Sequence, residues 1–300
     1  MLPTNKAIAY SLFDSGKREQ DCFDIDSYVR GLMINIRLNR LIYPDWTIVL
    51  HINQRVADRF NALFEPLLGE YFEYHIENDE PLCKAMLWRL KPIFQMRNNQ
   101  WRFSHVICRD LDSPVTYREA QAVQYWINRD TSAHAITDSV SHTIPMLGGM
   151  VGFRPAYFTE RMNARLWDAL FINCNIDFTK KGSDQDFLNR NVYPNFAQSG
   201  SDSITQHYFK GMPNTFLSDY RTCVCESIVG HKSDCPNNTE LSINVALKAT
   251  NEICGHIGAA GYYQPATEIF LYKYKEEFKD IAKAEDNFKD IFYWRIKNEF

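Results

Sequence analysis

The stretch "SHVICRDLDSPVTYREAQAVQYWI", residues 104–127, joins an apolar run to two aspartates and then to an amphipathic segment. The apolar run is rich in β-formers and predicts a buried strand. Thr116 and Glu119 then form a capping-box pattern, and apolar residues follow at helical spacing, which predicts a helix. Asp110 and Asp112 therefore lie where a strand ends and a helix is about to begin.

Similar runs precede this stretch in the chain. Strands are predicted over "KAIAYSLF" (6–13), "DWTIVLHIN" (45–53), "YFEYHI" (71–76) and "FSHVICRD" (103–110). Helices are predicted over "FDIDSYVRGLMINIRLNRLI" (23–42), "RVADRFNALFEPLL" (55–68) and "CKAMLWRLKPIF" (83–94), the last only as far as Pro92. This alternation predicts an α/β fold with a mainly parallel sheet flanked by helices.

The later part of the chain is less regular until "EIFLYKYKEEFKDIAKAEDNFKDIFYW" (268–294), where helical spacing returns. No internal repeat, low-complexity linker or Pro/Ser-rich boundary divides the sequence. We therefore expect one domain over residues 1–300, with a core at 1–215 and a C-terminal helical extension at 216–300.

Composition excludes several classes of protein. The chain has 300 residues, 45% of them hydrophobic, and a formal net charge of -4, which disfavours a general binder of nucleic acid or anionic membranes. No apolar run reaches the roughly 18 residues that a membrane span needs. The N-terminal segment lacks the features of a secretory signal. We expect a cytoplasmic protein whose eight cysteines are reduced.

The aspartate pair is a candidate metal site. In open α/β sheets ligands bind beyond the carboxyl ends of the strands, and residues i and i+2 of an extended chain point the same way. Two such carboxylates suit Mg²⁺ or Mn²⁺, which takes further ligands from water and substrate phosphates. A solvated acidic turn before a helix has the same pattern, so the spacing alone leaves both interpretations open.

The residues that follow form an ordered set. The chain reads "RDLDS" (109–113), "RE" (118–119), Trp126, then His134, Asp138 and His142, and finally "GGM" (148–150). This set resembles glycosyltransferases of the GT-A fold, and within them a group of short bacterial and large algal-virus (chlorella virus type) enzymes. The resemblance is continuous over about residues 84–155. It is weaker at "AIAYSLF" (7–13) and "GSDQDFLNRNVYP" (182–194), and little of it extends beyond residue 215.

The resemblance implies a nucleoside-diphosphate sugar donor, UDP-linked for preference, and a glycan or other hydroxyl acceptor. Asp110 and Asp112 would then hold Mn²⁺ or Mg²⁺, with Asp112 as the more direct ligand. The metal would neutralise charge on the departing diphosphate. Arg89 and Arg109 would contact phosphate, and the alternative for each is a structural ion pair.

Two further segments match places where GT-A enzymes hold the donor. Ser11, Leu12 and Phe13, at the end of the first strand, would contact the base and ribose, and the alternative is plain core strand. Gly148 and Gly149 would let the backbone approach the sugar closely because glycine has no Cβ, and the alternative is a glycine turn.

His134, Asp138 and His142 recur at i, i+4 and i+8. That spacing would place them on one face of a helix, although a loop is equally compatible with the residues around Pro145. The bare spacing suggests a zinc site, whereas the resemblance implies that Asp138 contacts the donor sugar.

The segment "GSDQDFLN" (182–189) resembles the Asp-Gln-Asp that many GT-A enzymes place beside the reacting carbon. Asp184 or Asp186 would be the general base if the reaction inverts configuration, and the segment would position the substrates if it retains configuration. The alternative for one of the two aspartates is a charged helix N-cap. A late histidine, His207, His231 or His256, is expected as a further metal ligand, and Gly-flanked His256 is the one we select.

Two rival functions remain from the sequence. A non-catalytic nucleotide-sugar-binding protein on a GT-A scaffold would keep the same residues without turnover. A phosphohydrolase of the haloacid-dehalogenase type also carries Asp-x-Asp at a strand end. That family has an apolar residue before the first aspartate and Thr or Val two after the second, where this chain has Arg109 and Pro114.

Overall fold

The structure is a computed structural model, and it describes residues 5–16, 25–69, 71–111, 115, 117–137, 144–197 and 203–208. Several predicted features lie outside the described residues: the C-terminal extension, Asp112, Asp138, His142, His231 and His256.

Most strands belong to one sheet. The strands are β1 (Lys6–Leu12), β2 (Trp46–Asn53), β3 (Phe72–Glu77), β4 (Met96–Arg97), β5 (Gln100–Trp101), β6 (His105–Arg109), β7 (Ala133–Thr137), β8 (Met150–Phe153) and β9 (Ile204–Tyr208). Seven of them form a sheet in the order β3-β2-β1-β6-β8-β7-β9, and β4 pairs with β5. Strand β8 is antiparallel to both β6 and β7, while the other pairs of the large sheet are parallel. The predicted α/β class with a mainly parallel sheet is therefore confirmed.

Helices connect the strands. The α-helices are α1 (Ile25–Ile42), α2 (Gln54–Phe64), α3 (Leu82–Met86), α4 (Tyr117–Arg129), α5 (Pro155–Arg161), α6 (Ser183–Phe187) and α7 (Tyr193–Ala197). The shorter types are the 3₁₀ helices η1 (Glu65–Leu67), η2 (Leu87–Phe94) and η3 (Trp167–Phe171) and the π-helix η4 (Leu188–Val192).

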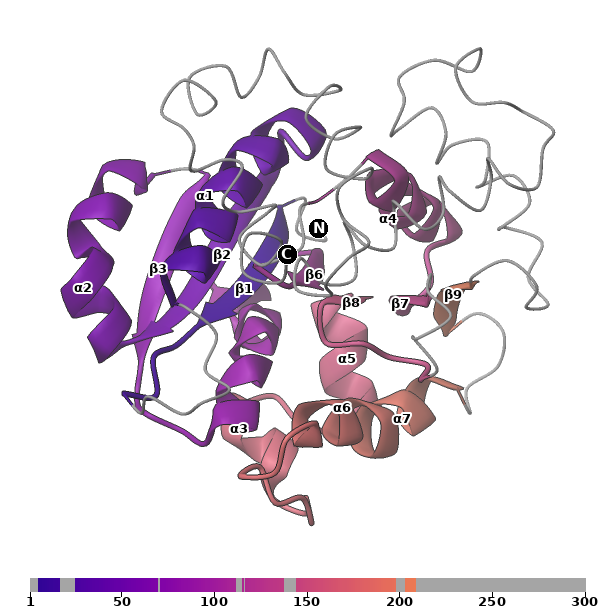
Figure 1. Cartoon of the computed structure of the whole chain (residues 1–300). Coiled ribbons are helices and arrows are strands. Elements are labelled where there is room, and N and C mark those ends of the chain that lie inside the picture. Colours follow the sequence, from indigo (N-terminus) through magenta and orange to yellow (C-terminus); the bar gives the residue numbers. More distant parts are fainter. Residues whose placement is uncertain are drawn as a thin grey trace, which may run out of the picture.

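The two faces of the sheet bury separate apolar clusters. Because side chains alternate along a strand, Ile8 and Tyr10 of β1 pack in one cluster with residues of α1, α2 and α4. Ala7 and Ala9 pack in the other, with residues of η2, α5, α6, η4 and α7. Figure 1 shows these helices on both sides of the sheet, with α4 above it and α5, α6 and α7 below it. Burial on both faces explains why the strands read as continuous apolar runs.

Two local expectations need correction. The helical alternative for the segment that begins at His134 is wrong over Ala133–Thr137, which is β7. This strand pairs with β8 on one side and β9 on the other, and those pairings come from distant parts of the sequence. The predicted helix end at Pro92 is also wrong, since η2 continues to Phe94 as a buried 3₁₀ helix.

Two further observations concern membrane-spanning helices and the cysteines. Within the described ranges, no helix has both the length and the apolar character needed to cross a membrane. Among the described residues, Cys83, Cys108 and Cys174 are free thiols. Burial raises the pKa of the Cys108 thiol to about 12, so this residue is an inert part of the core.

Candidate functional site

The strand register brings the aspartate and glycine motifs together. Arg109, the last residue of β6, pairs with Met150, the first residue of antiparallel β8. The residue after Arg109 is Asp110, and the residue before Met150 is Gly149. These two residues, 39 positions apart in the sequence numbering (149 − 110), therefore lie side by side at the edge of the sheet. It is the edge at which β1 and β2 also end.

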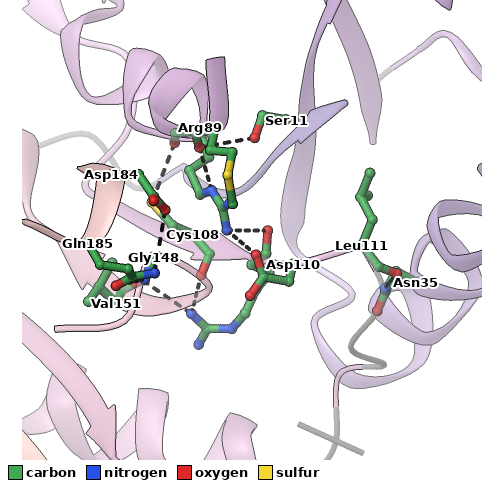
Figure 2. A network of polar contacts seen from close by, with 12 residues as sticks. Ser11, Asn35, Arg89, Cys108, Asp110, Leu111, Gly148, Val151, Asp184 and Gln185 are labelled. Carbon is green, nitrogen blue, oxygen red and sulfur yellow. Dashed lines mark hydrogen bonds and ion pairs between the residues drawn. The ribbon is translucent and has the colours of Figure 1, made fainter. Parts of the chain in front are cut away.

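Arg89 and Asp110 form the ionic centre of this edge. A guanidinium nitrogen of Arg89 pairs with Oδ1 of Asp110 (Figure 2). The Arg89 side chain is buried, and its Nε also donates to the carbonyl of Met86 at 2.7 Å. The Asp110 side chain remains 27% exposed, so its carboxylate is fixed in place and yet open to a ligand.

The two glycines are in contact with this ion pair. A Cβ added at Gly149 would lie 1.9 Å from Oδ2 of Asp110, which is far inside van der Waals contact. A Cβ added at Gly148 would meet only the ends of Gln185 and Arg89, at 3.4 Å or more. The absence of a side chain is therefore required at Gly149, where backbone and carboxylate meet, and much less at Gly148.

The structure separates Asp184 from Asp186. Both belong to α6, but Asp184 is buried, whereas the Asp186 side chain is 51% exposed and pairs with Arg190 at 3.3 Å. Burial raises the pKa of Asp184; the Arg89 charge opposes that shift, and the Asp110 charge adds to it. Asp184 thus lies within the field of Arg89 and Asp110, while Asp186 faces the solvent.

Two amides of the same segment hold the glycine loop. Oδ1 of Asn189 accepts from the backbone N–H of Met146 at 2.9 Å, and its Nδ2 donates to the Met146 carbonyl at 2.8 Å. The backbone N–H of Gly148 donates to Oε1 of Gln185 at 3.3 Å (Figure 2). The sequence argument considered only the aspartates here. The available signal was the spacing of Gln185 and Asn189, which places them on one helical face.

Arg109 occupies a different environment from Arg89. Alternation along β6 directs Arg109 to the α4 side of the sheet, where it forms a buried ion pair with Glu119. It also donates to the carbonyls of Cys108 at 2.7 Å and Val151 at 3.1 Å. This geometry matches the structural alternative considered for Arg109, and we do not propose a phosphate contact for it.

The three residues predicted to contact the base and ribose, at the end of β1, also lie in different environments. The hydroxyl of Ser11 donates to the Met86 carbonyl at 3.1 Å, the same carbonyl that Arg89 contacts. Leu12 packs in the apolar cluster of the other face. The ring of Phe13 lies edge-on to that of Trp88, with centroids 6.1 Å apart. Ser11 therefore joins the site, Phe13 lies beside the η2 helix and Leu12 belongs to the core.

His134 lies in the core of the sheet. It is buried on β7 and stacks on Trp126 with ring centroids 4.6 Å apart. A Cβ at Gly152 would lie 2.5 Å from its ring, so the histidine is packed against the neighbouring strand. This environment is that of a packed aromatic residue.

The site carries oxygen ligands of the kind that a hard divalent cation prefers. Asp110 is a carboxylate, whose oxygens suit Mg²⁺ or Mn²⁺, and a cation held there would also relieve its repulsion with the nearby Asp184 carboxylate. Across the described ranges, no three His, Cys, Asp or Glu side chains gather as a metal would require. Further ligands would have to come from Asp112, from water and from phosphate.

Comparisons with known proteins gave similarities only among solved structures. No family model and no curated protein sequence matches the chain. A 4-diphosphocytidyl-2C-methyl-D-erythritol synthase from Anaerococcus prevotii is 11% identical, with 72% of this chain and 92% of that chain covered and a TM-score of 0.42. S. aureus TarS 1-349 is 10% identical, with 98% and 88% covered and a TM-score of 0.40. Its complex with UDP-GlcNAc is 11% identical, with the same coverage and a TM-score of 0.42. Similarities of this size say nothing about the activity of this chain.

Proposed function

We propose that this protein is a glycosyltransferase that moves a sugar from a nucleoside-diphosphate donor, UDP-linked for preference, to a glycan or other hydroxyl acceptor. The observation that supports it best is the convergence of Asp110, Arg89, Gly149 and Asp184. Asp110 directly follows β6, Arg89 lies in η2, Gly149 precedes β8 and Asp184 lies in α6, and these residues meet at the carboxyl edge of the sheet. That edge is where ligands bind in open α/β sheets.

Each residue has a role that its surroundings support. Asp110, held by Arg89 and backed by Gly149, presents one carboxylate in a fixed position. Together with Asp112 it would hold Mn²⁺ or Mg²⁺. When bound, the metal would supply positive charge against the departing diphosphate. Arg89, which pairs with Asp110, would add a permanent positive charge beside the diphosphate.

Asp184 is our candidate for the group that handles the acceptor proton. A buried carboxylate with a raised pKa holds a proton more readily than an exposed one, which suits a general base. In an inverting reaction an Asp184 carboxylate oxygen would take the proton of the attacking hydroxyl. In a retaining reaction the same carboxylate would orient the acceptor, and the geometry favours neither outcome.

Turnover with a panel of UDP-sugars tests this function. We expect metal-dependent release of UDP from one donor, at least a hundredfold slower in Asp112→Ala with an unchanged circular dichroism spectrum. Full activity in Asp112→Ala would contradict the assignment of the site. Tight binding of a UDP-sugar by the wild-type protein without any turnover would favour the non-catalytic alternative.

A further inference from the structure

We infer that Asn189 is a positioning residue that fixes the glycine loop for binding the sugar part of the donor. This inference rests on the proposed function and extends it to a residue that does not itself touch the donor. Asn189 lies in the π-helix η4, which follows α6 directly. Short π-helical insertions are frequent at functional sites, because the extra residue redirects the side chains of that turn.

The contacts of Asn189 form a two-sided clamp. The side-chain amide of Asn189 forms hydrogen bonds with both backbone groups of Met146, donating to the carbonyl and accepting from the N–H. The same Nδ2 donates to the carbonyl of Gln185 at 2.8 Å, which ties the clamp to α6. Met146 is itself buried, so its backbone groups depend on Asn189 for hydrogen bonds that water would otherwise provide.

The clamp acts at a short distance from the site. Met146 is followed by Leu147, Gly148 and Gly149, and the Met150 N–H donates to the Leu147 carbonyl at 2.9 Å in a tight turn. That turn sets Gly149 against the Asp110 carboxylate and Gly148 against Gln185. A shift of Met146 would therefore move the backbone that faces Asp110 and Arg89.

Asn189→Leu is the most direct test, since leucine keeps the branching of the asparagine side chain and removes every hydrogen bond that its amide makes. Asn191→Leu is the matched control, because Asn191 lies in the same π-helix and its backbone carbonyl, rather than its side chain, makes the described contact, with Asn195. Both variants are compared with wild type in binding Mn²⁺-UDP and the best-bound of Mn²⁺-UDP-glucose, UDP-galactose and UDP-N-acetylglucosamine. The Met146 amide is followed by hydrogen exchange without nucleotide.

We expect Asn189→Leu to weaken UDP-sugar binding about tenfold while UDP binding changes less than about twofold, because in the proposed function the loop would contact the sugar and the metal would hold the diphosphate. Met146 exchange should accelerate in Asn189→Leu and stay at the wild-type rate in Asn191→Leu. Equal losses for UDP and UDP-sugar would overturn the positioning role, since a merely structural change would lower both.

An unchanged Met146 exchange rate in Asn189→Leu would overturn the clamp itself. Because exchange needs no nucleotide, this result is separate from a failure of the proposed function. That failure would be seen as no binding of UDP or any UDP-sugar by the wild-type protein, and it would overturn the positioning role as well.

Discussion

Asp184 and Asp186 are identical side chains two residues apart on one short helix, and their surroundings give them different chemistry. Asp184 is buried near Asp110 and Arg89, while Asp186 pairs with Arg190 at the surface. The sequence could not choose between them, because the choice depends on which side of α6 packs against the sheet. Helix α6 is only five residues long, too short for periodicity to reveal its buried side.

Asp184 should also give the protein a measurable pH dependence of stability. Its pKa is raised above the ordinary 3.8, so the folded state holds this proton more tightly than the unfolded state. The resulting stabilisation is present below pH 3.8 and is lost as pH rises through the raised native pKa. Asp184→Asn, which resembles the protonated form, should match wild type in acid and be the more stable protein at neutral pH.

Urea unfolding at pH 4 and pH 8 measures this effect. Asp186→Asn is the matched control on the same helix, and its free energy of unfolding should stay within about 0.5 kcal/mol of wild type. An Asp184→Asn protein that is less stable than wild type at pH 8 would show that the carboxylate is favourably paired rather than strained.

The Arg109–Glu119 pair should matter to stability more than any surface pair. Both side chains are buried, so Glu119→Gln would leave the Arg109 charge without its counterion. We expect the free energy of unfolding to fall by about 3–5 kcal/mol. In Asp186→Asn, which removes the charge that pairs with Arg190 at the surface, the fall should be no more than about 0.5 kcal/mol. Chemical denaturation of both variants measures the difference, and equal effects would contradict it.

At the scale of elements, the site depends on the pairing of β6 with β8. This antiparallel register sets Gly149 beside Asp110, although the two motifs are far apart in the sequence. Helix α1 contributes on the other side, where the amide of buried Asn35 donates to the Leu111 carbonyl at 3.1 Å (Figure 2). The same amide accepts from the Val115 N–H at 3.0 Å. Residues on both sides of positions 112–114 are thereby anchored to one helix.

The two adjacent glycines give a sharp test of this register. A methyl group at Gly149 must displace the Asp110 carboxylate, which Arg89 holds, whereas one at Gly148 meets only the flexible ends of side chains. We expect Gly149→Ala to weaken Mn²⁺-dependent nucleotide binding at least tenfold and Gly148→Ala less than about threefold. Isothermal titration of both variants measures this, and comparable losses in the two would argue against close contact between Gly149 and Asp110.

Much of this arrangement could be predicted because it is local. The strands that became β1, β2, β3 and β6 carry apolar runs, and the helices between them carry apolar residues at helical spacing. The character of β7 could not be predicted, because Ala133–Thr137 is a strand through its pairing with β8 and β9. The separate environments of Arg89 and Arg109 also required the structure, because Arg89 lies in η2 on one face of the sheet and Arg109 pairs with Glu119 of α4 on the other.

At the scale of the whole molecule, the described part is a sheet with a different apolar cluster on each face and one polar edge. The apolar clusters are built on alternate residues of the same strands. Residues of the candidate site gather where the strands end, at the margin of both clusters, so the site can vary in chemistry without disturbing the core. The prediction of one domain over 1–300 with a C-terminal extension remains a prediction.

The central claim is that this edge binds a nucleoside diphosphate through a metal. The most direct test is calorimetric titration of the full chain with UDP, GDP, ADP, CDP and their sugar conjugates, in Mn²⁺ and again in EDTA. We predict that one nucleotide binds in Mn²⁺, that EDTA abolishes the binding, and that Asp112→Ala loses it without unfolding. Binding of no nucleotide in either condition, by a folded wild-type protein, would contradict the account.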